Sequence, residues 1–79
     1  MSAPSYTVLL TLAATQSFAL LPSSLQGAIV RRLEQLAQGA EALPDEGGAS
    51  RQVIWADLNV FYRVEHATRR IVVIAADER

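Results

Sequence analysis

The sequence contains no cysteine and no lysine, and it has a single histidine, His66. Without cysteine the chain has no disulfide, no thiol nucleophile and no thiolate ligand for a metal. One histidine without cysteine also disfavours a structural zinc site. We therefore expect neither a metal nor a cofactor. All seven basic residues are arginine, which indicates either a genome rich in G and C or a need for the bidentate binding of phosphate or carboxylate.

Long apolar runs and strong net charge are also missing. No apolar run approaches the roughly 20 residues that span a membrane. Residues 1–4 lack the basic segment and apolar stretch of a secretory signal. We therefore expect a cytoplasmic protein without a membrane partner. The net charge of −1 argues against broad, non-specific binding of nucleic acid.

The composition is that of one small globular domain spanning residues 1–79. Of its 79 residues, 51% are hydrophobic and 19% are charged. A chain of this length buries only about 60–65% of its unfolded surface. Its stability must therefore come from a compact core or from a partner.

The first half of the chain predicts a strand and two helices. Tyr6–Thr11 is rich in β-branched and aromatic residues, as strands are. Leu12–Leu20 predicts a short helix, which Pro22 separates from a second, amphipathic one. In the second helix, apolar residues recur at helical spacing from Leu25, and Gly39 is a stop signal.

The second half predicts three strands. Residues 41–50 form a loop, and the strand Arg51–Ala56 follows. Asp57–Asn59 is predicted to be a turn, and the hairpin strands Val60–His66 and Arg69–Ile74 complete the pattern. The element order is thus β-α-α-β-β-β. It indicates an α+β domain, in which a helical hairpin packs on one face of a mainly antiparallel four-stranded sheet.

These elements, in this order, resemble the RelE/ParE superfamily of bacterial toxins from toxin–antitoxin systems. The resemblance covers nearly the whole chain. It includes the first strand, the Leu20-Leu21-Pro22 corner and the helix around residues 29–37. Its most specific part is the pairing of Phe-Tyr-Arg-Val at 61–64 with Ile-Val-Val-Ile-Ala-Ala-Asp-Glu-Arg at 71–79.

The resemblance implies a growth-inhibiting toxin of the plasmid stabilisation type. RelE-like members are ribosome-dependent endoribonucleases that cut messenger RNA, whereas ParE-like members act on DNA gyrase. Both imply a cognate antitoxin as partner and a toxin–antitoxin hetero-oligomer. In the RelE-like chemistry a 2′-hydroxyl attacks the adjacent phosphate, and cationic side chains on the exposed sheet face stabilise the phosphorane-like transition state.

Compared position by position, the sequence departs from the RelE-like pattern. Arg79 matches the arginine that follows the last strand. Asn59 and Glu78, however, stand where RelE-like members tend to have an arginine and a lysine. Of the basic residues expected on the second strand only Arg51 is present, and the tyrosine expected after Arg79 has no counterpart. These differences favour a ParE-like action, while the arginines keep ribosome-dependent cleavage open. The alternative is a non-catalytic protein-interaction module that retains the fold.

The candidate catalytic residues are Arg63 and Arg79. Arg63 alternates with Val60, Tyr62 and Val64, so it lies on the other face of its strand, where a target would bind. A cross-strand ion pair of Arg63 with Glu65 or a neighbouring carboxylate is the competing interpretation. For Arg79 the competing interpretation is a solvated chain end.

Five further residues are candidates for binding the target or the antitoxin: Arg51, Trp55, Phe61, Arg69 and Arg70. Each of these arginines has a solvated surface charge as its alternative. Trp55 belongs either to the core or to an exposed aromatic platform. His66 has the side chain that enzymes use most often as a general base, but without a visible orienting group we expect an exposed structural histidine. Tyr62 is expected in the core.

Overall fold

The elements follow one another as the sequence pattern predicts. The computed structural model describes residues 6–44 and 47–78. In chain order the elements are β1 (Thr7–Leu10), α1 (Leu12–Ala19), α2 (Ser23–Gly39), the 3-10 turn η1 (Ala40–Ala42), β2 (Arg51–Trp55), β3 (Leu58–Glu65) and β4 (Arg70–Glu78). Their order and type confirm the predicted α+β architecture.

The strands form one four-stranded sheet in the order β1-β4-β3-β2. β3 pairs antiparallel with both β2 and β4, whereas β1 pairs parallel with β4, in a register that places Thr7 beside Arg70 and Leu10 beside Val73. The last strand in the sequence therefore lies between the first strand and β3. The sheet is mixed but mostly antiparallel, as predicted.

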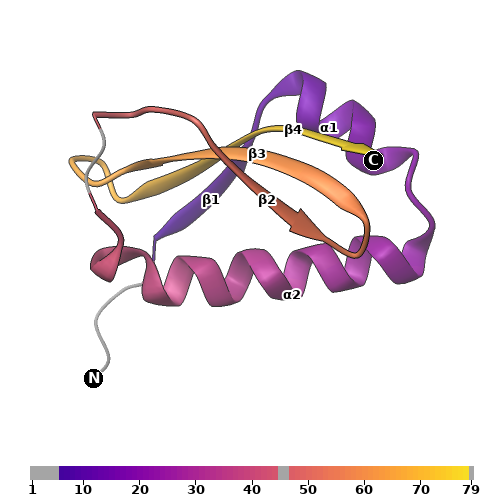
Figure 1. The fold of residues 1–79 in the computed structure, drawn as a ribbon, viewed down its shortest axis with the longest axis horizontal. Helices are drawn as coiled ribbons and strands as arrows, with labels where there is room; N and C mark the ends of the chain where they lie inside the picture. The colour runs from indigo at the N-terminus through magenta and orange to yellow at the C-terminus, as the bar shows by residue number, and fades with distance from the viewer. Residues whose placement is uncertain (1–5, 45–46, 79) are drawn as a thin grey trace.

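Helix α2 covers one face of the sheet along its length (Figure 1). Its buried residues are Ile29, Leu33 and Ala37, which are spaced by four and therefore share one side of the helix. They pack against alternate strand residues, among them Leu58, Val60, Tyr62, Val64, Ile71 and Val73. The hydrophobic core thus lies between α2 and the sheet, and the predicted core position of Tyr62 is confirmed.

Helix α1 lies beside the C-terminal part of β4, beyond the end of β1 (Figure 1). Thr11 joins the two elements. Its hydroxyl oxygen accepts a hydrogen bond from the backbone N–H of Ala14, at 3.1 Å, and so caps the helix. The same hydroxyl donates to the carbonyl of Ile74, at 2.7 Å. Thr11 therefore caps α1 and also bonds the start of this helix to β4, just beyond the part of β4 that pairs with β1.

The turn between β2 and β3 is shorter than the sequence suggested. Only Ala56 and Asp57 form it, with φ angles of 51° and 64°, and β3 begins at Leu58. The prediction of a turn at Asp57–Asn59 is therefore wrong. Two residues with positive φ are typical of the tight hairpin turn whose twist matches that of the strands. Leu58 is buried because it continues the inward alternation of Val60.

Candidate functional site on the open face of the sheet

The face of the sheet that α2 leaves uncovered, here called the open face, carries alternate residues of each strand. On β3 buried and half-buried residues alternate, and Asn59, Phe61, Arg63 and Glu65 form the half-buried set. Strand pairing adds Gln52 and Ile54 from β2, Arg70 and Val72 from β4, and Thr7 and Leu9 from β1. The orientation predicted for Phe61 and Arg63, away from the helix, is confirmed.

Arg63, Glu65, Thr68 and Arg70 form a hydrogen-bonded group at one end of the open face, which we call the Glu65 cluster. Nε of Arg63 donates to Oε2 of Glu65 at 2.9 Å. Oε1 of Glu65 accepts from Nη2 of Arg70 at 2.7 Å and from its Nε at 3.1 Å. The hydroxyl of Thr68 also lies 3.1 Å from Oε1. One carboxylate therefore holds two guanidinium groups and a hydroxyl.

The electrostatics of the cluster follow from this geometry. Hydrogen bonds from Arg63 and then Arg70 lower the pKa of Glu65, with a smaller contribution from Thr68, while partial desolvation opposes them. Glu65 is therefore anionic at neutral pH, between two cations. The Arg63 and Arg70 side chains are 41% and 43% exposed, against 22% for Glu65, so solvent reaches both guanidinium groups.

The pairing of Arg63 with Glu65 matches the competing interpretation given above, although the two residues lie along the same strand rather than across strands. Within the described part of the chain, this bond from Nε is the only hydrogen bond of the Arg63 guanidinium. Its two Nη groups therefore keep their donors for water or a ligand. The ion pair thus orients the Arg63 side chain through Nε and leaves both Nη groups available.

Arg69 and Arg51 do not join the cluster. Arg69 has a φ of 52°, and its guanidinium donates to Oε1 of Glu41 at 3.2 Å and lies 6.0 Å from the ring centroid of Tyr6. Arg51 opens β2, as predicted, and its Nη2 donates to the carbonyl of Pro44 at 2.6 Å. The strand register places Arg51 beside buried Tyr62, on the helix side of the sheet.

The two candidate aromatic residues lie on opposite faces. Trp55 pairs with buried Leu58 and packs partly buried against the core, so it is not on the open face. Phe61 lies two residues before Arg63 on the same face of β3. Only Phe61 of this pair adjoins the Glu65 cluster. Arg79, the other candidate catalytic residue, lies outside the residues that the structure describes.

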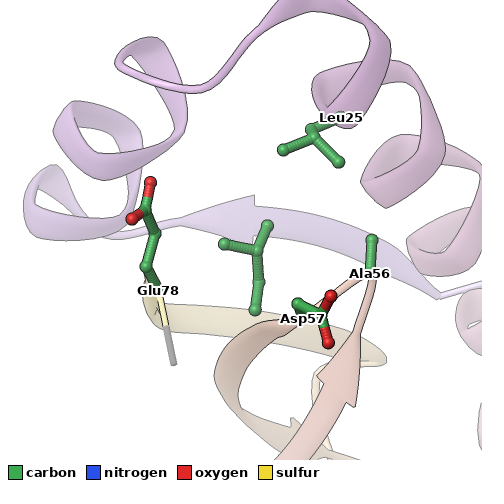
Figure 2. Close-up of a pocket in the computed structure, with 5 residues that line it drawn as sticks. Leu25, Ala56, Asp57 and Glu78 are labelled. Carbon is green, nitrogen blue, oxygen red and sulfur yellow. The ribbon is translucent and has the colours of Figure 1, made fainter.

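The opposite end of the sheet is acidic. An open pocket of about 680 Å³ is lined by Leu25, Ala56, Asp57, Leu58 and Glu78. Figure 2 shows Leu25 reaching in from α2 and Asp57 from the β2–β3 turn, with Glu78 at the end of β4. Glu78 thus lines this pocket and does not belong to the Glu65 cluster.

Sequence reasoning missed two features. The first is that Glu65 also binds Arg70, although a hairpin with residues 66–69 between its strands places these two side chains opposite each other. The second is the position of His66. It is half-buried rather than exposed, because its Nδ1 lies 2.6 Å from the hydroxyl of Tyr6. The expectation of an exposed histidine is wrong, since residues 60 positions apart carry no local signal of their contact.

The side chains suited to metals do not gather in the described ranges, 6–44 and 47–78. No group of three or more histidine, aspartate or glutamate residues there could hold a metal ion. Neither α1 nor α2 combines the length and apolar character needed to cross a membrane.

Comparison with known proteins gives a clear structural result and no sequence match. No protein-family model matches the chain, and no curated protein matches its sequence. A chain of the RelBE2 toxin–antitoxin complex from Mycobacterium tuberculosis superposes with a TM-score of 0.77 and 21% identity, over 96% of this chain and 100% of that one. The chain has the RelE toxin fold.

Two further RelE structures support the same assignment. The intact Escherichia coli RelBE complex gives a TM-score of 0.76 at 15% identity, covering 94% of this chain and 96% of the other. The archaeal RelE–RelB complex from Pyrococcus horikoshii gives 0.69 at 16% identity, covering 96% and 97%. The RelE fold therefore spans essentially the whole of this chain.

Proposed function

We propose that this chain is the toxin of a bacterial toxin–antitoxin pair and inhibits growth in the cytoplasm through the open face of its sheet. The observation that carries the proposal is the RelE fold over 96% of the chain, combined with half-exposed Arg63 and Arg70 on the open face. The shared fold supports the assignment to toxins, and the two arginines support the open face as the surface that binds the target.

The target that this surface favours is ribosome-bound messenger RNA. Arg63 and Arg70 present guanidinium groups suited to phosphate, and Phe61 offers a ring on which a base can stack. In the proposed reaction the 2′-hydroxyl gives its proton to water and its oxygen bonds to phosphorus. The bond from phosphorus to the 5′-oxygen breaks, and the 5′-oxygen leaves with a proton taken from water. Arg63, with Arg79 as the second candidate, stabilises the charge that develops on the phosphate oxygens.

A ParE-like action on DNA gyrase is the second candidate. Its support is the weakness of the available bases: hydrogen bonds from Arg63 and Arg70 lower the pKa of Glu65, and the imidazole of His66 is directed to Tyr6. On this alternative, Arg51, Phe61, Arg69 and Arg70 bind protein and no RNA is cut. A non-toxic interaction module with the same fold is the remaining possibility.

We also propose that an antitoxin neutralises the chain by forming a hetero-oligomer with it. The support is apolar surface that a small domain leaves uncovered: Leu12, the first residue of α1, is 75% exposed, and Leu20, which follows the helix, is 86% exposed. Leu9 and Leu10, just before Leu12 in the sequence, are also 39% and 38% exposed, and it is exposed apolar residues in groups that mark surfaces a partner covers. A partner segment that orders as it binds would bury them.

The test is induction of the chain in bacteria without an antitoxin, followed by transcript mapping. We expect growth to stop and cellular messages to be cut. Arg63→Ala should relieve the arrest, whereas Arg31→Ala, an exposed arginine on α2, should not. Uncut transcripts with a DNA-damage response would favour the gyrase target. Normal growth with the folded protein present would leave only the interaction module.

A further inference from the structure

We propose that Glu65 is an internal competitor for a phosphate-binding site formed by Arg63, Thr68 and Arg70, and that a phosphodiester of RNA displaces it. The choice of RNA as the source of the phosphate rests on the function proposed above. The site itself rests on the geometry of the cluster. Glu65 then regulates the open face by keeping the site occupied in the free protein.

The donors of the cluster already converge on an oxyanion. Arg63 and Arg70 direct their N–H groups, and Thr68 its hydroxyl, at the two oxygens of one carboxylate, over distances of 2.7 to 3.1 Å. Guanidinium groups bind phosphate oxygens with the same planar, paired geometry that they use for carboxylate. The cluster is therefore a ready oxyanion site whose present occupant belongs to the chain itself.

The occupant is free to leave. Glu65 is the last residue of β3, and its side chain is 22% exposed, so rotation about its side-chain bonds carries the carboxylate into water. Its two arginine partners are 41% and 43% exposed, and ion pairs that solvent screens in this way stabilise proteins little. The Nη groups of Arg63 have no hydrogen bond to a described residue, and can contact an incoming phosphate before Glu65 departs.

Displacement changes the charge that a ligand meets. With Glu65 in place the cluster carries two cations and one anion; without it, the two cations face the ligand alone. An isolated phosphate must therefore overcome the carboxylate with few other contacts. A single strand of RNA also offers a base to Phe61, two residues from Arg63 on the same face, about 7 Å along the strand. The ligand class is thus a phosphodiester attached to an unstacked base.

The first experiment measures binding of an oligouridylate of about eight nucleotides to the purified chain and to Glu65→Gln. Removing the anion while keeping the shape should tighten binding about tenfold at low salt, and the gain should shrink as salt screens the charges. Glu34→Gln is the matched control, because Glu34 is an exposed residue of α2 and lies outside the cluster. It should leave the affinity unchanged. Arg63→Ala should abolish the gain made by Glu65→Gln.

A second experiment needs no substitution. The Nε–H resonances of Arg63 and Arg70 in the unaltered chain report on their bonds to Glu65. We expect both to shift as the oligouridylate is added, while those of Arg31 and Arg32, on the far side of α2, stay in place. Inorganic phosphate is expected to cause the same shifts only at much higher concentration.

The outcomes separate this proposal from the proposed function. Equal affinity of the unaltered chain and Glu65→Gln, or no RNA binding by either, overturns the internal competitor. So do shifts caused by inorganic phosphate but not by RNA. Growth arrest without tighter binding by Glu65→Gln would support the toxin function and reject the internal competitor. Tighter binding without growth arrest would support the phosphate-binding site and reject the toxin function.

Discussion

The hydroxyl of Tyr6 and Nδ1 of His66 lie 2.6 Å apart, although 60 positions separate the two residues in the sequence. Their rings meet edge to face, with centroids 5.6 Å apart. Among the described atoms, Nε2 of the same imidazole is buried without a hydrogen-bond partner. This contact fastens the residue before β1 to the first residue of the β3–β4 turn, next to the Glu65 cluster.

Tyr6→Phe removes the hydroxyl of this pair and leaves both nitrogens of His66 unpaired. We expect the free energy of unfolding to fall by about 1–2 kcal/mol, the usual effect of orphaning a partly buried polar group. Urea denaturation measures it. Tyr62→Phe is the control, since the Tyr62 hydroxyl has no hydrogen bond to a described residue. Equal losses in the two variants would contradict a role for the Tyr6–His66 bond.

The Glu65 cluster predicts a pH dependence of stability. Because the pKa of Glu65 is lowered in the folded chain, chiefly by Arg63, the cluster stabilises the fold above the unfolded glutamate pKa of about 4.3. This contribution disappears as the pH falls through the lowered folded value. Glu65→Gln should therefore be less stable than the unaltered chain near pH 7, and the gap should close in acid.

A double-mutant cycle isolates the cause of that dependence. If the hydrogen bond from Arg63 is the main source of the lowered pKa, Glu65→Gln should cost less in an Arg63→Ala background than in the unaltered chain. Thermal denaturation at several pH values gives the four stabilities. The same cost in both backgrounds would assign the effect to Arg70 instead.

Ala56 offers a stabilising substitution. It adopts a φ of 51° in the two-residue β2–β3 turn, a left-handed conformation that costs a residue with a Cβ roughly 1–2 kcal/mol. Asparagine tolerates this conformation and favours such turns. Ala56→Asn should therefore raise the free energy of unfolding by about 0.5–1 kcal/mol, a part of that cost. Ala67→Asn, in the other hairpin turn but without positive φ, should show no comparable gain.

Neighbouring residues of α2 separate core packing from surface effects. Ile29 is 2% exposed and faces the sheet, whereas Val30 is 41% exposed. Ile29→Ala should lower stability by about 2–5 kcal/mol through lost burial and the cavity left behind. Val30→Ala should change it by less than about 0.5 kcal/mol. Guanidinium denaturation of both variants tests the placement of the helix on the sheet.

The sequence predicts those parts of the fold in which apolar residues recur at a regular spacing. The spacing of Ile29 and Leu33 identifies the buried side of α2, and the alternation of Val60, Tyr62 and Val64 identifies the buried side of β3. Both signals are local, because they depend on the geometry of one helix or one strand. They suffice to place Arg63 on the open face before any strand is paired.

Contacts between distant residues leave no such pattern. Nothing near Tyr6 indicates His66, and nothing in Thr7–Leu10 indicates that β1 pairs parallel with β4. The Glu65–Arg70 pair is intermediate between a local pattern and a contact between distant residues. It follows from the length of the β3–β4 turn, but only once both strand ends are fixed, and strand ends are the least certain part of a prediction from sequence.

β4 is the last strand in the sequence but lies between β1 and β3 in the sheet. This position determines when the open face is complete. Ribosomes release β1, both helices, β2 and β3 before β4, so during synthesis the first strand has no partner and Glu65 lacks Arg70. Parallel pairing between elements so far apart in sequence also closes late in folding. The open face is therefore complete only after its own translation has passed β4. A ligand that needs both Arg63 and Arg70 can therefore bind only a chain whose last strand has already joined the sheet.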